Sequence, residues 1–517
     1  MGNSVLNGWK GLFLLLAILT AALFYDISNV PLFDEDEGTY ALVSCEMLET
    51  GDFLVPRLEG RPFFHKPPLF YWIQASCIRL LGSSEAALRL PSALASFAWA
   101  LLVFLFVKKR VGPEEAWFTS FFLVTAAQTN LIAKAAIPDA LLNLCITATM
   151  LAMFEYFNTR RKVYLWVAFG TMGIGFLTKG PIAVAIPAAV GTCYHLFNGH
   201  FTRWLKTATD PLGVMIFILI ALPWYMVLFS TFGESFFKEF FLIHNLRRFG
   251  SAMEGHSGPF FYYIPVILLG LMPYTILLFS TCRNIKNIWA EPLGRYLVLW
   301  FLFVLILFSM AGTKLHHYIV YGYVPLLIFM ARSLKNARGT YILLVPLLGF
   351  ILFLAALPAA ASLSATFVTD EFAKLVLKSA LMEFGTGFYV TVTIAFVCIM
   401  GLAFIPGIRV QLKTVVFGLM FTILINGCLI PKVASIMQTP IKSAALLAKN
   451  KGYDVVMWRM SYPSFSFYYG RPLLKREPQA GDVIITKADK LNDFPAYTII
   501  YQDHSIVLAR IEVLPKS

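Results

Sequence analysis

Long apolar segments recur along most of this 517-residue chain, and mainly short polar connections separate them. A helix needs about 20 mainly apolar residues to cross a bilayer, and segments of this kind predict about 13 spans. They lie near residues 11–30, 90–107, 116–133, 139–157, 164–178, 180–197, 212–230, 260–281, 296–311, 317–331, 340–358, 387–405 and 414–430. The pattern therefore predicts an α-helical polytopic membrane protein.

The pattern changes after residue 430, where the long apolar segments end. Residues 441–450 predict a helix, and residues 455–458, 483–486, 497–501 and 505–511 predict strands. We therefore expect a transmembrane domain at residues 1–430 and a small α/β domain at residues 431–517. The sequence leaves open whether the second domain helps to bind a substrate or only covers the first.

Composition and charge agree with a membrane protein. The chain is 58% hydrophobic and 14% charged, whereas soluble domains carry about 25% charged residues. Its net charge of +13 comes from dispersed basic residues, which favour cytoplasmic anchoring over nucleic-acid binding. Basic clusters such as 108–110 fall in alternate connections, on the side of Lys10. The positive-inside rule then predicts a cytoplasmic N-terminus and a periplasmic C-terminal domain in a bacterial inner membrane.

The first outer connection, residues 31–89, has local structure of its own. Residues 40–50 and 69–81 predict amphipathic helices, which end at Gly51 and Gly82. Helices of this kind lie in the membrane interface, so we expect them to hold Asp36 and Lys66 at headgroup depth.

Acidic residues gather at the outer membrane edge. The run Asp34-Glu35-Asp36-Glu37 follows the first span, and Asp139 precedes the fourth. Carboxylates are costly at a bilayer edge, and Asp36 or Glu37 could act as a general base toward a hydroxyl. The alternatives are a solvated turn for the run and a helix N-cap for Asp139.

Basic residues on the outer side depart from the positive-inside pattern. The relevant ones are Arg57, Lys66, Lys179, Arg248 and Lys314. A shared anionic ligand, such as a lipid phosphate, explains them. The alternatives are that a long loop escapes the rule and that Lys66 is a snorkelling anchor.

These residues belong to a series of short motifs that resembles a known family. The chain is similar to GT-C glycosyltransferases that use lipid-phosphate sugars, especially the aminoarabinose transferases of lipid A and the related protein O-mannosyltransferases. The matching motifs span residues 34 to 318. They are Asp36 to Tyr40, Glu46 to Asp52, Val55 to Leu58, Lys66-Pro67-Pro68, Arg89 to Ser92, Pro138-Asp139, Thr178 to Gly180, Asn245 to Phe249, Pro259 to Tyr263 and Lys314 to Tyr318.

The resemblance implies a GT-C fold and roles for individual residues. Asp36 matches the catalytic or acceptor-positioning aspartate, Asp139 a second outer acid, and Lys66 the lysine that holds the lipid phosphate. The resemblance also implies further members of the donor pocket, namely Tyr40, Lys179, Lys314 and Tyr318. The chain departs from the aminoarabinose transferases at Thr39, where they usually have arginine, and at His65, where they commonly have glutamate.

We therefore predict a glycosyltransferase that moves a sugar from a polyprenyl phosphate, such as undecaprenyl phosphate, by a single inverting displacement. The expected acceptor is lipid A or another glycolipid, and the alternative acceptor is a protein hydroxyl. No cofactor is required, and His65 and His244 are the candidate ligands for a divalent metal. A transporter or flippase is the alternative from another class, but its charges would lie near the middle of the spans.

Overall fold

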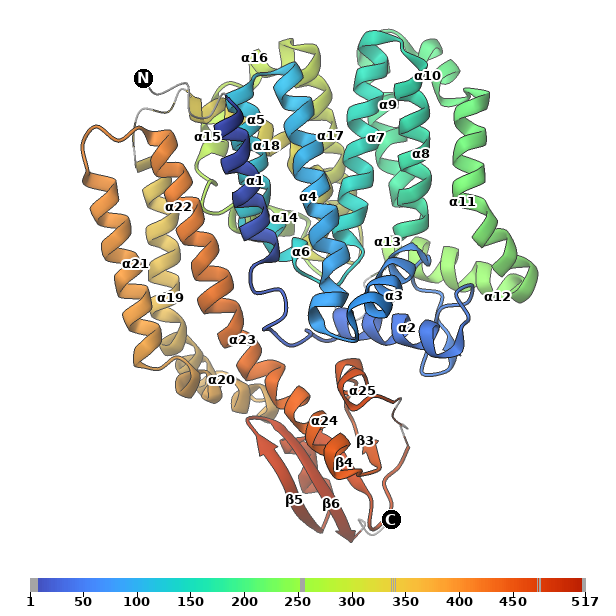
Figure 1. Ribbon diagram of the computed structural model, residues 1–517, viewed down its shortest axis with the longest axis vertical. Coiled ribbons are helices and arrows are strands. Elements are labelled where there is room, and N and C mark those ends of the chain that lie inside the picture. The colour runs from blue at the N-terminus through green and yellow to red at the C-terminus, as the bar shows by residue number, and fades with distance from the viewer. Residues whose placement is uncertain are drawn as a thin grey trace.

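The computed structural model describes residues 8–251, 256–335, 337, 339, 341–471, 473 and 476–513. Figure 1 shows a bundle of roughly aligned helices with a small sheet below one end. The predicted class, an α-helical polytopic protein with a small C-terminal α/β unit, is confirmed.

The first half of the bundle follows the predicted spans. Its helices are α1 (Trp9–Phe24), α4 (Glu85–Arg110), α5 (Pro113–Thr125), α6 (Ala127–Ala133), α7 (Asp139–Thr159), α8 (Lys162–Lys179), α9 (Ile182–Phe197), α10 (Phe201–Ala208) and α11 (Pro211–Phe232). The connection 231–258, expected as a loop, contains α12 (Glu234–Phe237), the π-helix η1 (Lys238–Arg247) and α13 (Arg248–Gly250).

The second half contains the remaining spans and further helices that were not predicted, of which α20 (Glu371–Glu383) is the longest. Its other helices are η2 (Phe260–Tyr262), α14 (Tyr263–Gly270), α15 (Leu277–Arg283), α16 (Ile285–Ala290), α17 (Pro292–Met310), η3 (His316–Gly322), α18 (Tyr323–Lys335), α19 (Tyr341–Phe367), α21 (Thr386–Phe404), α22 (Val410–Leu424), η4 (Ile425–Leu429) and α23 (Ile430–Met437).

Two predicted spans are interrupted. The span 116–133 breaks at Ala126, which is extended, and the span 260–281 breaks before Pro273, which has no N–H to continue a helix. The two breaks face each other, because the Ala127 N–H donates to the Met272 carbonyl at 3.0 Å. Backbone groups freed within a bilayer need such partners.

The outer surface of the bundle is apolar. Within the described ranges, seven helices are long and apolar enough to cross a membrane. Only 28% of the apolar window of α11, 33% of that of α19 and 28% of that of α21 is buried inside the protein. Apolar faces of this size are stable only against lipid, which fits the polytopic arrangement.

The predicted helices of the 31–89 connection are present. They are α2 (Asp36–Thr50), which ends at the left-handed Gly51, and α3 (Leu69–Leu81), and the short strands β1 (Arg57–Leu58) and β2 (Arg61–Pro62) pair between them. Most of α2 is buried against protein, and its expected interfacial position stays a prediction. Part of that cover comes from a helix of the C-terminal unit.

The C-terminal unit consists of a four-stranded sheet and short helices. Its elements are α24 (Thr439–Lys451), β3 (Val455–Met457), α25 (Pro463–Tyr469), β4 (Val483–Lys487), η5 (Ala488–Asp493), β5 (Ala496–Asp503) and β6 (Ile506–Val513). The strand order is β3-β4-β6-β5, with β3 parallel to β4 and the other pairs antiparallel. The predicted helix and strands are found, but α25 was not expected.

Helix runs on through residue 430, from α22 by way of η4 into α23, so the division into domains 1–430 and 431–517 stays a prediction. Figure 1 shows α2, α3 and the sheet at one end of the bundle, and α10 and α16 at the other. The acidic connection and the C-terminal unit therefore share one side.

Candidate functional site

Two cavities lie near the end of the bundle that carries α2 and α3. The first, called the acidic cavity here, has a volume of about 400 Å³ and is lined by the acidic run and by apolar residues. Its polar lining residues are Asp26, Asp34, Glu35, Asp36, Glu37, Arg89, Lys134, His316, His317 and Asn426. Sequence analysis singled out two of the acids, Asp36 and Glu37, as catalytic candidates.

The second cavity, called the lysine cavity, has a volume of about 420 Å³. Lys66 and Lys179 line it together with two tyrosines, Tyr318 and Tyr321. The rest of its wall is mainly apolar and includes Ile182, Ala185, Phe241, Leu246, Phe249, Leu307 and Phe308. A cationic rim beside an apolar wall is suited to an anionic headgroup on a hydrocarbon chain.

A buried ion pair connects the two cavities. Asp139 is the first residue of α7 rather than its N-cap, and Lys179 is the last residue of α8. The Lys179 Nζ donates to both Asp139 oxygens at 2.7 Å, and the Tyr321 hydroxyl donates to Oδ1 at 2.6 Å. His317, which lines the acidic cavity, lies 3.7 Å from the same oxygen. The Asp139 carboxylate therefore touches groups of both cavities.

Glu37 is buried, and hydrogen bonds from several residues hold its carboxylate in place. Arg89 from α4 donates to its two carboxylate oxygens at 2.9 Å and 2.7 Å, and the N–H groups of Phe33 and Ala136 donate at 2.8 Å and 2.6 Å. Arg89 also donates to the Val30 carbonyl at 2.6 Å. Such a buried bidentate pair fixes the acidic run against the bundle. Asp36, by contrast, is exposed toward the acidic cavity.

Lys66 and Tyr318 meet the expectation of a shared pocket. The Lys66 Nζ donates to the His65 carbonyl at 3.2 Å, and the Lys179 Nζ lies 5.3 Å from the Tyr318 ring. Both lysines line one cavity although they are more than a hundred residues apart in the chain.

Three other predicted pocket residues, Lys314, Arg57 and Tyr40, are not among those that line either cavity. Lys314 donates to the carbonyls of Ser309 and Ala311 at 2.7 Å and so caps the end of α17, and burial lowers its pKa. Arg57 forms a half-exposed pair with Asp52 at 3.4 Å.

Tyr40 packs against Phe70 and Tyr71, with ring centroids 6.3 and 5.8 Å apart. The side chain of Arg248 lies outside the described residues.

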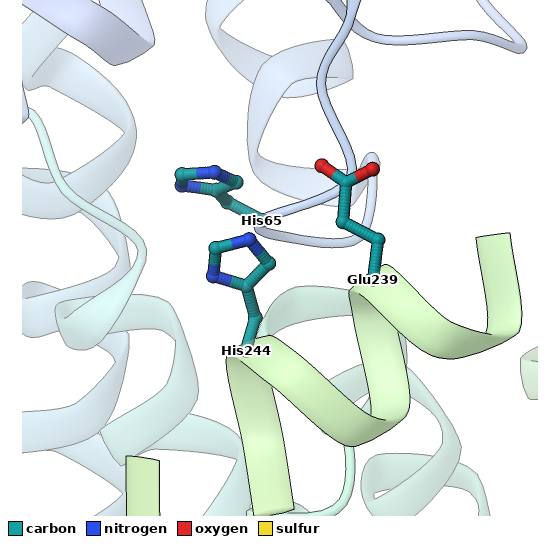
Figure 2. A group of neighbouring side chains, drawn as sticks. All are labelled: His65, Glu239 and His244. Atoms are coloured by element: carbon teal, nitrogen blue, oxygen red, sulfur yellow. The ribbon is translucent and has the colours of Figure 1, made fainter. Parts of the chain in front are cut away.

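A candidate metal centre adjoins the lysine cavity. Figure 2 shows His65 beside His244 and Glu239, which both come from η1. One ligand atom from each of the three residues lies within 4.8 Å of the others. Two imidazoles and one carboxylate form a donor set that suits Zn²⁺. The two histidines were predicted as candidate ligands from the sequence, but Glu239 was not, because its spacing from them along the chain matches no known metal-binding motif.

Tyr321 and His317 were also missed as site residues. Tyr318 and Tyr321 are three residues apart on the 3₁₀-helix η3, so their side chains lie on one face. Their rings stack at 6.4 Å. The Trp300 Nε1 donates to the Tyr321 carbonyl at 2.8 Å and holds η3 in place. The three-residue spacing after Tyr318 was the available signal.

The chain is similar in sequence to known proteins. Residues 65–226 match the family described as dolichyl-phosphate-mannose-protein mannosyltransferase. An uncharacterized protein of Aquifex aeolicus (strain VF5) is 30% identical over 353 residues, which is 66% of this chain and 80% of that protein.

Two further relatives carry the name undecaprenyl phosphate-alpha-4-amino-4-deoxy-L-arabinose arabinosyl transferase. The protein of Shewanella sediminis (strain HAW-EB3) is 29% identical over 62% of this chain, and that of Edwardsiella ictaluri (strain 93-146) is 31% identical over 60%. The chain spans 60% and 56% of the length of these two relatives.

One solved structure has the same fold over almost the whole chain. It is ArnT from Cupriavidus metallidurans bound to undecaprenyl phosphate, with a TM-score of 0.77 and 19% identity. The alignment covers 98% of this chain and 100% of that one. The fold expected from the sequence motifs is therefore confirmed.

Proposed function

We propose that this chain is a GT-C glycosyltransferase that uses polyprenyl-phosphate sugars, and that it transfers 4-amino-4-deoxy-L-arabinose from undecaprenyl phosphate to lipid A. The observation that carries the proposal is the pair of adjacent cavities, one cationic and apolar and one acidic, which the Asp139 cluster joins. A transferase needs such neighbouring sites for a lipid-linked donor and for an acceptor.

The donor occupies the lysine cavity. Its prenyl chain lies along the apolar wall, and its phosphate meets Lys66 and Lys179. When the glycosidic bond breaks, the phosphate oxygen takes the electron pair and gains negative charge. Two ammonium groups placed beforehand in a partly dry cavity stabilise that charge more in the transition state than in the bound donor.

The acceptor enters from the acidic cavity, where Asp36 is exposed. An oxygen of the acceptor attacks the anomeric carbon on the face opposite the leaving phosphate, so the configuration inverts. A phosphate acceptor arrives ionised and needs no base, and Asp36 then orients it. A hydroxyl acceptor transfers its proton to Asp36.

The membrane orientation follows from the charges at the two ends of the bundle. We place α2, α3 and the C-terminal sheet in the periplasm and Lys108 to Arg110 in the cytoplasm. This orientation puts both cavities on the side where undecaprenyl-linked sugars and lipid A meet.

A divalent metal bound by His65, Glu239 and His244 would add positive charge near the donor phosphate. The lysines alone provide charge neutralisation in the displacement above, so no step depends on the metal.

The second candidate is transfer to protein hydroxyls, which the match to the protein mannosyltransferase family supports. Mass spectrometry of lipid A and of envelope glycoproteins, from cells with and without this chain, decides between the two. Aminoarabinose on lipid A that depends on the chain supports the proposal. If lipid A is unchanged and envelope proteins lack a glycan only in the cells without this chain, the second candidate is established instead.

A further inference from the structure

A helix of the C-terminal unit contacts the acidic run directly. Ser464, near the start of α25, donates its backbone N–H to Asp34 Oδ1 at 2.9 Å, and its hydroxyl also hydrogen-bonds to Asp34 Oδ2. The two residues are 430 positions apart in the chain, and Ser464 is 1% exposed. The contact is therefore a bidentate one between distant segments, in which Ser464 is buried and Asp34 is partly buried.

Gly38 makes this close approach sterically feasible. A Cβ atom at Gly38 would lie 2.4 Å from Asp34 Oδ1 and 2.5 Å from the Ser464 backbone nitrogen. These distances are too short for any side chain, so a residue with a Cβ at this position would push α25 away from α2. The glycine belongs to the same Asp36-to-Tyr40 segment that carries the catalytic candidate.

A second set of contacts holds the other end of α25. The Tyr468 hydroxyl accepts from the Leu32 N–H at 2.8 Å and donates to Glu85 Oε1 at 3.0 Å. Lys442 of α24 contacts the same Glu85 oxygen at 2.5 Å. The C-terminal unit is thus attached at two points, through Leu32 just before the acidic run and through Asp34, the first residue of the run.

Asp36 lies between two anchored carboxylates. Asp34 is held from the C-terminal side by Ser464, and Glu37 is held from the bundle side by Arg89. Because hydrogen bonds hold both Asp34 and Glu37, the backbone at Asp36 has little freedom to turn. We propose that Ser464 is a positioning residue for Asp36, so that the C-terminal unit completes the transferase site. This inference rests on the proposed function for its kinetic test.

The charged surroundings of Asp34 supply a specific readout. Burial raises the pKa of Asp34 to about 7, against the hydrogen bonds from Ser464, which favour the carboxylate. Loss of the Ser464 hydroxyl should therefore raise this pKa further. The other titratable or charged groups around Asp34 and its cavity are Glu35, Asp36, Glu37, Arg89, Tyr462, Asp26, Lys134, His316 and His317.

The kinetic test uses the full chain in lipid nanodiscs, with undecaprenyl-phosphate-linked aminoarabinose as donor and lipid A as acceptor. Ser464→Ala removes one hydrogen bond to a carboxylate, and we expect kcat to fall about three- to tenfold while the KM for the donor stays within about twofold. Ser464→Thr keeps the hydroxyl and should recover most of the lost turnover. Ser461→Ala, at an exposed serine of the same unit, is the matched control.

The pH profile of kcat separates positioning from mere stability. We expect Asp34 to give the wild-type profile an inflection near pH 7, and Ser464→Ala should move that inflection upward. Asp34→Asn should abolish it. Wild-type kcat together with an unmoved inflection in Ser464→Ala would overturn the proposal, as would an unchanged profile in Asp34→Asn.

Hydrogen exchange of residues 33–39 tests the contact without any substrate. Ser464→Ala should speed amide exchange in this segment, whereas Ser461→Ala should leave it unchanged. If the wild-type protein transfers no sugar, the proposed function fails, but the exchange rates still decide whether Ser464 holds the segment. Equal exchange in Ser464→Ala and wild type would contradict the positioning role.

Discussion

Lys179 donates to both carboxylate oxygens of Asp139 at 2.7 Å, although 40 residues separate them in the chain. The side chains are 10% and 3% exposed, so the pair is buried, and Tyr321 adds a third donor to Asp139. A buried charge is tolerated only with such partners. The pair also lies where the two cavities meet, which links the stability of the bundle to its chemistry.

The Asp139 pair should therefore show strong coupling. Asp139→Asn leaves the Lys179 ammonium without its carboxylate, and we expect a loss of about 3 kcal/mol or more in unfolding free energy. Lys179→Met alone leaves the Asp139 carboxylate without its cationic partner and should lower the unfolding free energy by a similar amount. The double variant should lose much less than the sum of the two. Denaturant unfolding of the four proteins measures the coupling, and strictly additive losses would contradict it.

Asp36→Asn should lower turnover on the order of 100-fold while the protein still folds, because the amide keeps the size of the side chain and removes its charge. Glu49→Gln, at an exposed acid near the end of the same helix, is the control. Both variants are compared in the lipid A transfer assay and by thermal unfolding. Near-wild-type turnover in Asp36→Asn would remove this residue from the mechanism.

Lys66→Ala should weaken binding of undecaprenyl phosphate about tenfold or more, because the phosphate loses a charge-assisted partner. Lys66→Arg should keep part of the affinity, although the guanidinium has a different shape. Lys108→Ala, at the opposite end of α4 from the cavities, is the control. If Lys66→Ala binds the lipid as tightly as the wild type does, Lys66 is only a snorkelling anchor.

The stability of the protein should depend on the ionisation of Asp34. Its ordinary pKa of 3.8 rises to about 7 in the folded state because of burial. The folded protein therefore binds the proton more tightly, so this contribution is complete below pH 3.8 and is lost as pH rises through 7. We expect the unfolding temperature to fall between about pH 4 and pH 7. Asp34→Asn should flatten that slope, and an equal slope in both proteins would show that other groups cause it.

The membrane orientation is tested by thiol labelling in cells whose outer membrane is permeabilised. Exposed Cys282 and Cys398 are first replaced by serine. Asn450 is an exposed residue of α24, and Asn450→Cys should then react with a membrane-impermeant reagent in whole cells. Thr202→Cys, on exposed α10, should react only after the inner membrane is broken. The reverse result would place both cavities in the cytoplasm and would contradict the proposed transfer at the periplasmic face.

Local sequence patterns were sufficient for most of the long elements of this protein, but not for α12, α20 or α25. A helix that crosses a bilayer must be long and apolar, and Gly51 and Gly82 mark the ends of α2 and α3, so the spans, these two helices and the strands of the sheet could be predicted from local patterns. The same patterns indicated that Asp36, Lys66 and Lys179 lie on one side, because the positive-inside rule depends only on the order of charges along the chain.

Only the tertiary structure decided which of these residues meet. Packing paired Asp139 with Lys179 and Glu37 with Arg89, turned Lys314 toward the carbonyls of α17, and brought Glu239 to the two histidines. No local signal specifies such contacts, since they depend on how helices far apart in sequence cross. The same is true of α25, a helix of seven residues. Its Ser464 contacts Asp34 of the acidic run, although the two are 430 positions apart in the chain.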